Sequence, residues 1–199
     1  MNPHPETADE LVVLLDDALR PAGTAAKTEV HTDHTPLHLA FSCYVRNAEG
    51  ELLLTRRALG KVAWPGVWTN SFCGHPGPGE EFQAAVERRA HQELGLDAEP
   101  FSQITGVIPD YQYRAVDASG VVEWEFCPVF VAELREGAKL RPEPAEVADY
   151  RWIRPVDLVR AVESAPFAFS PWLADQLSRP ALRRALGAGS AEGAADARA

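Results

Sequence analysis

The chain has 199 residues, of which 46% are hydrophobic and 24% are charged, and its formal net charge is −10. A chain of this length and apolar content can bury a core without disulfides or a structural metal, so we expect one globular domain. No stretch approaches the roughly 20 apolar residues of a membrane span. The acidic balance argues against a nucleic-acid partner, because such proteins usually carry a basic face.

The cysteine content points to a reducing compartment. Three cysteines, Cys43, Cys73 and Cys127, cannot all pair within one chain. The first ten residues are polar and acidic, unlike a signal or transit peptide. We therefore expect a cytoplasmic protein with no membrane partner, present as a monomer or a weak homodimer.

The first half of the chain contains three recognisable elements. Leu11–Leu15 is a short apolar run before a turn and predicts a strand, although a short helix fits nearly as well. His38–Arg46 and Glu51–Arg56 flank a turn and predict a β-hairpin. Glu80–Leu94 places its apolar residues on one face and is followed by Gly95, which predicts a helix with a glycine cap.

The second half begins with strands and ends with helices. Ile104–Ala115 and Val121–Leu134 are rich in β-formers and are joined by a turn. Tyr150–Ile153 predicts a further strand. Pro155–Ala165 and Ser170–Leu186 predict helices, and each has a proline near its start, where it costs little.

The order of these elements defines the expected architecture. Strands and helices alternate irregularly, which predicts an α+β fold with mixed β-sheets flanked by helices. The low-complexity segment from Gly187 onward predicts a disordered tail over residues 187–199. A single domain is therefore expected over residues 1–186.

The most distinctive segment is the run AWPGVWTNSFCGHP, residues 63–76. Cys73 and His75 stand two apart on a turn punctuated by glycine and proline, which suits nucleophilic, acid–base or metal-binding roles. Any one of these residues alone is better explained as part of a Trp-rich core turn with an idle cysteine. The further His and Glu residues on either side favour a functional interpretation.

Candidate metal ligands surround this run. They comprise three histidines and two glutamates: His31, His38, His75, Glu123 and Glu125. The two glutamates stand two apart in a predicted strand, so both face one side and Trp124 faces the other. Three imidazoles and two carboxylates suit Zn²⁺, Mn²⁺, Fe²⁺ or Mg²⁺ with five or six ligands. Neither a His pair nor a Glu-x-Glu is specific alone, and His34 is a neighbouring decoy, but their co-occurrence with the Cys-Gly-His turn favours a site.

Basic residues also cluster around the same run. Arg56, Arg57 and Lys61 precede it, and Arg88 and Arg89 follow it. A cationic cluster in an acidic protein can attract a small polyanion such as a diphosphate. Each of these residues taken singly is better explained as an ordinary surface charge.

From Gly74 onward the sequence GHPGPGEEFQAAVERRAHQELGL has the spacing of a Nudix box. The matching positions are Gly74, Glu80, Arg88, Glu93 and Gly95. Two acids of the box are replaced, by Arg89 and Gln92, which removes charge needed to bind several Mg²⁺ ions. The box therefore predicts a Nudix-like fold, and its missing acids argue against hydrolysis. Arg89 could hold a substrate phosphate instead.

Taken together, the motifs resemble type I isopentenyl-diphosphate delta-isomerase, a family of Nudix-fold enzymes. The resemblance is carried by HTPLHLAFS, TRRALGKVAWPGVWTNSFCGHP, RRAHQELG, YRAVDASGVVEWEFCPVF and PFAFSPW. It implies an enzyme of isoprenoid precursor biosynthesis that converts isopentenyl diphosphate to dimethylallyl diphosphate. Such an enzyme adds one proton and removes another through a tertiary carbocation.

The resemblance also implies roles for individual residues. The family's metal site corresponds to His31, His38, His75, Glu123 and Glu125, and would hold one divalent ion, Mn²⁺, Zn²⁺ or Mg²⁺. A second ion, a diphosphate-bound Mg²⁺, would use Glu93 and the backbone at Cys73. The family often has Asn between the two glutamates, where this chain has Trp124, and we expect little effect because that side chain faces away.

The catalytic and substrate-binding positions follow in the same way. The family's base corresponds to Cys73, its acid to Glu125, and a tyrosine that assists protonation to Tyr113. A neighbouring cation would favour the thiolate of the cysteine. Trp172 would lie over the hydrocarbon end of the substrate, where its ring stabilises the carbocation. The diphosphate would be held by Lys27, Arg57, Lys61 and Arg89.

Two other functions fit part of the sequence. A Nudix hydrolase of a nucleoside or prenyl diphosphate would share the fold and the basic cluster, but the missing acids weigh against it. A metal- or ligand-binding module without activity would also use a Trp-rich pocket. Measured isomerisation distinguishes the predicted enzyme from both.

Overall fold

The computed structural model describes residues 10–189, and this part of the chain is built on two β-sheets. The first sheet has the strand order β2 (Pro21–Ala26), β1 (Leu11–Leu15), β3 (His38–Leu39), β10 (Val122–Phe126) and β9 (Gln112–Val116). The main strands of the second are β12 (Val147–Ile153), β5 (Leu52–Arg57), β4 (Phe41–Arg46), β11 (Val129–Leu134) and β8 (Phe101–Ile108). Two short strands complete it: β6 (Trp68–Thr69) pairs with β5, and β7 (Phe72–Gly74) pairs with β4.

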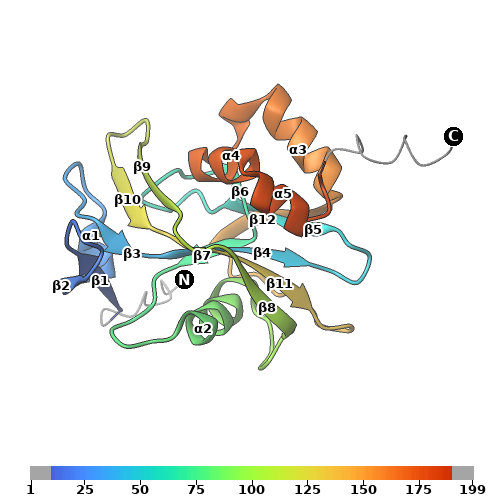
Figure 1. Cartoon of the computed structure of the whole chain (residues 1–199), viewed down its shortest axis with the longest axis horizontal. Helices are drawn as coiled ribbons and strands as arrows, with labels where there is room; N and C mark the ends of the chain where they lie inside the picture. Colours follow the sequence, from blue (N-terminus) through green and yellow to red (C-terminus); the bar gives the residue numbers. More distant parts are fainter. Residues whose placement is uncertain (1–9, 190–199) are drawn as a thin grey trace, which may run out of the picture.

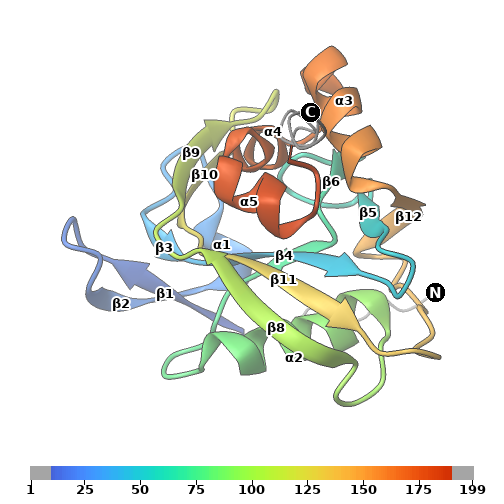
Figure 2. The same cartoon turned by 45° about the vertical axis from the view of Figure 1, so that its right-hand side comes forward.

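Helices cover both faces of the larger sheet (Figure 1). The helical segments are α1 (Lys27–Val30), α2 (Phe82–Leu94), α3 (Pro155–Ser164), the 3₁₀ helix η1 (Pro166–Ala168), α4 (Pro171–Ser178) and α5 (Pro180–Ala185). Figure 2 shows α2 beneath this sheet and α3, α4 and α5 above it. The mixed sheets and flanking helices confirm the predicted α+β class.

Alternation along β4 explains the two layers. Phe41, Cys43 and Val45 are buried in the cluster that includes α2. Tyr44 is buried in the other cluster, among residues of α3, α4 and α5. Since successive side chains of a strand point to opposite faces, one strand contributes to both cores.

Two predicted strands each divide between the two sheets. His38–Arg46 becomes β3 and β4, and Val121–Leu134 becomes β10 and β11. The two segments stay paired in parallel on both sides of the division. Glu125 lies opposite His38 in one sheet, and Val129 lies opposite Ser42 in the other. This crossing brings residues far apart in sequence to one place, and the candidate site lies there.

Other predicted elements need smaller corrections. Ile104–Ala115 is two strands, β8 and β9, in different sheets. The helix expected over Ser170–Leu186 is broken into α4 and α5 at Pro180, which has no backbone N–H for a continuous helix. The turn of the predicted hairpin is confirmed, since Asn47 N–H donates to the Glu51 carbonyl at 3.0 Å. Its two strands, however, pair only at Arg46 and Leu52, because β6 and β7 lie beyond that point.

The helix within the Nudix-like segment, predicted over Glu80–Leu94, begins at Phe82 and ends at Leu94 as predicted. Gly95 has φ +60° and its N–H reaches the carbonyls of Ala90 and His91, a left-handed glycine cap. The first predicted strand, Leu11–Leu15, is confirmed as β1. The short elements β2, α1, β6 and β7 were not predicted from the sequence.

Two further predictions concern the C-terminal tail and membrane-spanning segments. Most of the predicted tail, residues 190–199, lies outside the described residues. Among residues 10–189, none of the helices combines the length and the apolar character that crossing a membrane requires.

Candidate active site

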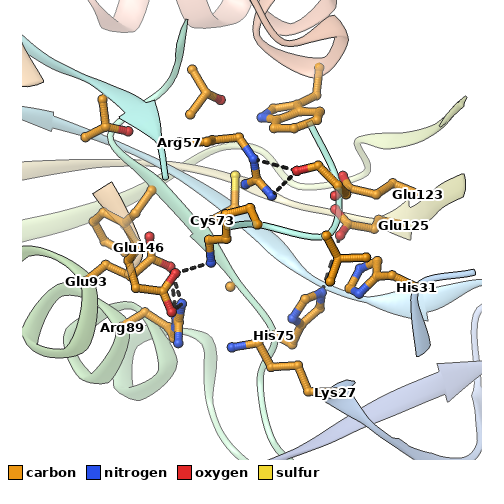
Figure 3. Close-up of a pocket in the computed structure, with 18 of the residues that line it drawn as sticks. Lys27, His31, Arg57, Cys73, His75, Arg89, Glu93, Glu123, Glu125 and Glu146 are labelled. Atoms are coloured by element: carbon orange, nitrogen blue, oxygen red, sulfur yellow. Dashed lines mark hydrogen bonds and ion pairs between the residues drawn. The ribbon is translucent and has the colours of Figure 1, made fainter. Parts of the chain in front are cut away.

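A pocket opens where the two sheets meet (Figure 3). It is lined by all but one of the predicted site residues: Lys27, His31, Arg57, Lys61, Cys73, His75, Arg89, Glu93, Tyr113, Glu123, Glu125 and Trp172. The exception, His38, is fully buried beside the pocket. In Figure 3 the side chains of Arg89, Glu93 and Glu146 lie on one side and those of His31 and Glu125 on the other, with Cys73 between them.

Three histidines and one glutamate converge on a single point. The candidate ligand atoms of His31, His38, His75 and Glu125 all lie within 4.8 Å of one another. Glu125 Oε1 is 3.5 Å from His38 Nε2 and 3.4 Å from His75 Nε2. The parallel pairing of β3 with β10 accounts for this approach, because it places His38 directly opposite Glu125.

Unsatisfied nitrogens in this cluster fit a metal ion. His38 Nδ1 lies 2.9 Å from the Pro36 carbonyl, so it carries the proton and leaves the Nε2 lone pair directed at the cluster. His38 Nε2 and both ring nitrogens of His75 are buried without a hydrogen-bond partner among the described residues. Buried polar atoms are rarely left unpaired, and three neutral imidazoles with a carboxylate are typical ligands of a divalent ion.

The charges of the cluster agree with this interpretation. Burial lowers the pKa of His31 to about 3 and that of His75 to about 4, so both rings are neutral. For His38, burial lowers the pKa, but the facing Glu125 carboxylate and the Pro36 carbonyl together outweigh burial and raise it, because the negative charge of Glu125 favours a cation at this position. Burial would raise the pKa of Glu125, yet His38 and His75 hold it well below its usual range. The site therefore contains one ionised carboxylate among imidazoles.

Glu123 lies on the same face of β10 as Glu125 but outside the four-ligand group. Both glutamates are buried and line the pocket, while Trp124 does not, which confirms the predicted alternation. Glu123 Oε2 accepts a hydrogen bond of 2.5 Å from the Tyr113 hydroxyl. Burial and the charge of Glu125 raise the pKa of Glu123 to about 7. Glu123 therefore contacts Tyr113 and is not among the four residues whose ligand atoms converge.

Tyr113 stands at the junction of the acidic and aromatic parts of the pocket. It pairs with Glu125 in the β9–β10 register. Its ring lies 5.7 Å from that of Trp172, centroid to centroid. Burial and the charges of Glu123 and Glu125 raise the pKa of its hydroxyl well above the usual value, so the phenol is protonated.

Cys73 faces the pocket from β7. Its Sγ lies 3.4 Å from Ser42 Oγ and 3.4 Å from both polar atoms of the Asn70 amide. Burial raises the pKa of the thiol to about 12, although Ser42 and Arg57 act in the opposite direction. The charge of Arg57 thus acts toward the thiolate, in the expected direction, but among the protein side chains it does not outweigh burial.

The predicted diphosphate-binding cations are already partly paired. Lys27 Nζ lies 2.9 Å from Glu10, and Lys61 forms an ion pair with Glu146. Arg89 is buried and forms an ion pair with Glu93, and its Nη2 is 3.6 Å from Glu146 Oε1.

Arg57 differs from these three cations. It donates hydrogen bonds of 2.7 and 3.0 Å to the Ala63 carbonyl, and its guanidinium carbon is 5.6 Å from the centroid of the Trp172 ring. Within residues 10–189 it has no ion-pair partner, so its charge is free for an anion.

The remaining charged candidates lie away from the pocket. Arg56 donates to the Gly66 carbonyl at 2.9 Å, and Arg88 pairs with Glu80 at 2.7 Å. His34 is exposed beside Asp33 and does not line the pocket, as expected of a histidine outside the metal site.

Sequence reasoning missed several residues of the site. Glu146 lines the pocket, and Glu10 pairs with the cations behind it. Neither belongs to a motif, so no pattern indicated them. Asn70, Ser42 and Gln176 form a fully buried polar group next to Cys73. Of these, only Asn70 lies within the Trp-rich run. Its polar side chain between Trp68 and Phe72 could have indicated a buried hydrogen-bonding residue.

Comparison with known proteins identifies the class. The NUDIX domain family matches residues 36–173. The crystal structure of DR0079 from Deinococcus radiodurans is similar with a TM-score of 0.65 and 19% identity, covering 85% of this chain and 98% of that one. A MutT protein from Methanosarcina mazei gives a TM-score of 0.55 at 20% identity over 75% of this chain and 96% of its own. The fold and the match together define a NUDIX-domain protein.

Closer relatives narrow this class. The isopentenyl-diphosphate Delta-isomerase of Kocuria rhizophila is 62% identical over 180 residues, covering 89% of this chain and 96% of that protein. The protein of the same name from Clavibacter michiganensis subsp. michiganensis is 55% identical over 190 residues, covering 96% of this chain and 95% of its own. The chain therefore belongs to the isopentenyl-diphosphate Delta-isomerase family.

Proposed function

We propose that this chain converts isopentenyl diphosphate to dimethylallyl diphosphate by protonation and deprotonation through a tertiary carbocation. The observation that carries the proposal is the arrangement of one pocket, which combines a group of cations with a buried acid, a thiol and an aromatic ring. The family membership reported above supports the same reaction. Three free cysteines agree with a reducing cytoplasm as its location.

The substrate's only strong binding group is its diphosphate. Arg57 has no ion-pair partner among the described residues, and Lys61, Arg89 and Lys27 would exchange part of their contact with glutamates for contact with phosphate oxygens. Holding the diphosphate fixes the position of the hydrocarbon end, which has no polar handle of its own. Binding remote from the reacting carbons can thereby contribute to the rate.

Two divalent ions would complete the site. His31, His38, His75 and Glu125 fit one ion, with Glu123 adjacent, and its identity among Mn²⁺, Zn²⁺ and Mg²⁺ is to be measured. Glu93 and the backbone at Cys73 would hold a Mg²⁺ that also contacts the diphosphate. When bound, these ions supply positive charge that lowers the pKa of groups they contact.

Protonation of an alkene requires a strong acid in a dry site. We assign this step to Glu125, assisted by Tyr113, because Glu125 is buried, Tyr113 is half-buried and both line the pocket. Because Glu125 is ionised among the protein side chains, its proton must be delivered to it. Tyr113 donates a hydrogen bond to Glu123, whose pKa is raised, and stands opposite Glu125 in the strand register, so it would relay a proton from Glu123 to Glu125. Exclusion of water strengthens the electrostatic interactions of such a site.

The cation that results must be stabilised and then deprotonated. Trp172 presents a π face without a reactive nucleophile, and an aromatic ring contributes about 2 kcal/mol to a desolvated cation. Cys73 is assigned as the base that removes the second proton, from the carbon next to the one bearing the diphosphate. Because the side chains alone keep the thiol protonated, ionisation of Cys73 depends on the positive charge brought by the bound ions.

The test is ¹H NMR of isopentenyl diphosphate incubated with the protein in D₂O with Mg²⁺ and either Mn²⁺ or Zn²⁺. We expect dimethylallyl diphosphate with deuterium in the new methyl group. No conversion by a folded, metal-loaded sample would refute the proposal. Release of phosphate or inorganic diphosphate would instead support the Nudix hydrolase considered from the sequence.

A further inference from the structure

Asn70 is a fully buried polar residue next to the reacting groups, and the proposed reaction gives it no role. It lies between β6 and β7, three residues before Cys73. These two short strands separate β5 from β4, since β6 pairs with β5 and β7 pairs with β4. The Asn70 side chain therefore lies inside the larger sheet rather than at its edge.

The orientation of the Asn70 amide is fixed by its partners. Nδ2 donates to the Cys43 carbonyl at 3.0 Å and to the Phe72 carbonyl at 2.8 Å, which uses both amide protons. Oδ1 accepts from Trp172 Nε1 at 2.9 Å and from Thr69 Oγ1 at 2.9 Å. The reverse orientation would place an oxygen against two carbonyls and an NH₂ group against an indole N–H, so only one orientation is satisfied.

One atom of this amide joins two groups assigned to the reaction. Asn70 Oδ1, which holds the Trp172 indole, also lies 3.4 Å from Cys73 Sγ. Both amide protons are already used, so the thiol is best described as a donor to this oxygen. Cys73 comes from β7 and Trp172 from α4, and both line the pocket.

Neighbouring contacts continue this connection between α4 and the sheet. The Trp68 carbonyl accepts from Ser170 N–H at 2.9 Å, and Thr69 Oγ1 lies 2.9 Å from Ser170 Oγ. Ser170 is the N-cap of α4, two residues before Trp172. The start of this helix is thus attached to the segment that carries Asn70, and the amide adds the contact that reaches the indole.

We propose that Asn70 is a positioning residue that sets the spacing between the Cys73 thiol and the Trp172 indole, between which the hydrocarbon part of the substrate is held. The inference rests on the proposed function, which assigns the base to Cys73 and stabilisation of the cation to Trp172. Asn70 would act only through these two residues. A displacement of about 1 Å in such groups can lower a rate by roughly a hundredfold.

The first test compares Asn70→Ser with the matched control Ser71→Ala. Ser71 is equally buried, accepts from Val45 N–H at 2.7 Å and donates to the Leu53 carbonyl at 2.6 Å, but the structure gives it no contact with the thiol or the indole. For Asn70→Ser we expect kcat to fall roughly 10- to 100-fold while KM changes by less than about threefold. Inhibition by inorganic diphosphate, which probes only the cations, should stay unchanged, and Ser71→Ala should retain kcat.

The second test observes the Trp172 indole directly. Its ¹⁵N–¹H resonance is assigned by its absence in Trp172→Phe. In the wild-type protein we expect slow exchange of this proton with D₂O, and in Asn70→Ser an upfield shift of the resonance as the hydrogen bond is lost. This measurement needs no turnover, so it separates failure of the positioning role from failure of the isomerase assignment, which would show as an inactive wild-type protein.

Several results would overturn the inference. An unchanged kcat in Asn70→Ser would do so, as would an unchanged indole resonance. Parallel losses of kcat and of diphosphate inhibition would indicate a general structural role instead. If Asn70→Ser does not fold, fast exchange of the wild-type indole proton would still refute the hydrogen bond on which the inference depends.

Discussion

Arg89 replaces an acid of the Nudix box, and its removal has an effect on stability that can be worked out from its contacts. Its side chain is only 5% exposed and pairs with Glu93, with Glu146 Oε1 3.6 Å away. Burial would lower its pKa, but the charges of Glu93, Glu146 and Glu10 outweigh burial and raise it. Arg89→Met keeps the aliphatic volume and removes the charge.

Removing one partner of a buried ion pair costs about 3–5 kcal/mol, because a charge is left uncompensated. Lys61 still pairs with Glu146 and Lys27 with Glu10 in the variant, so Glu93 is the carboxylate left alone. We therefore expect the lower end of that range, about 3 kcal/mol. For a chain of this size that corresponds to a melting temperature roughly 6–12 °C lower.

The assay is urea denaturation with fluorescence and circular dichroism, with Arg88→Met as the matched control. Arg88 directly precedes Arg89 on the same helix, but its side chain is 30% exposed where it pairs with Glu80 and donates to the His75 carbonyl. Ion pairs that keep contact with solvent contribute less than buried ones, so we expect a smaller loss of stability for Arg88→Met. Adding Glu93→Gln to Arg89→Met should restore most of the loss, since it removes the isolated charge.

The pH dependence gives a second measure. Burial would raise the pKa of Glu146, but Lys61 and Arg89 outweigh burial and lower it from 4.5 to about 2. A depressed carboxyl pKa stabilises the folded state above pH 4.5, and this stabilisation is lost as the pH falls toward 2. Arg89→Met lacks the part of this stabilisation that comes from Arg89. The difference in unfolding free energy between wild type and variant should therefore become smaller as the pH falls from 4.5 toward 2. Equal losses in Arg89→Met and Arg88→Met, or no rescue by Glu93→Gln, would refute this reasoning.

Four further predictions concern the site and the fold. Cys73→Ala should reduce turnover roughly 10²- to 10⁴-fold with little change in unfolding midpoint, and wild-type turnover would refute the role of the thiol. Glu125→Gln should likewise abolish most turnover in a folded protein, as checked by the NMR assay. Cys127→Ala, in a buried residue that does not line the pocket, should keep most activity, and an inactive but folded variant would mean that the wrong cysteine was chosen. EDTA should lower the melting temperature and added Zn²⁺ or Mn²⁺ should restore it, because an ion that binds only the folded state stabilises it; a midpoint indifferent to both would count against the His/Glu metal site.

Patterns confined to a few neighbouring residues could be read from the sequence. The helix ending at Gly95, the turn at Asn47 and the apolar strand Leu11–Leu15 all follow from local backbone preferences and hydrogen bonds. The identity of the candidate residues was equally accessible, because motifs such as Cys73-Gly-His75 consist of adjacent positions. What these signals share is a physical cause that acts within one turn or one strand.

The sites of strand division could not be read in this way. His38–Arg46 and Val121–Leu134 look like single strands because residues on both faces become buried, first in one sheet and then in the other. Where each chain passes between the sheets depends on its pairing with a partner far away in sequence. That pairing, not a local preference, places His38 opposite Glu125.

The sequence by itself therefore determined the class of the fold and the kinds of side chain available for chemistry. Only the tertiary structure decided which of them meet: three histidines around Glu125, Glu123 on Tyr113, and Arg89 among carboxylates. The physical reason is that burial and charge pairing depend on the whole set of neighbours. A residue such as Asn70, whose partners lie up to 102 positions away, acquires its role only when these neighbours are assembled.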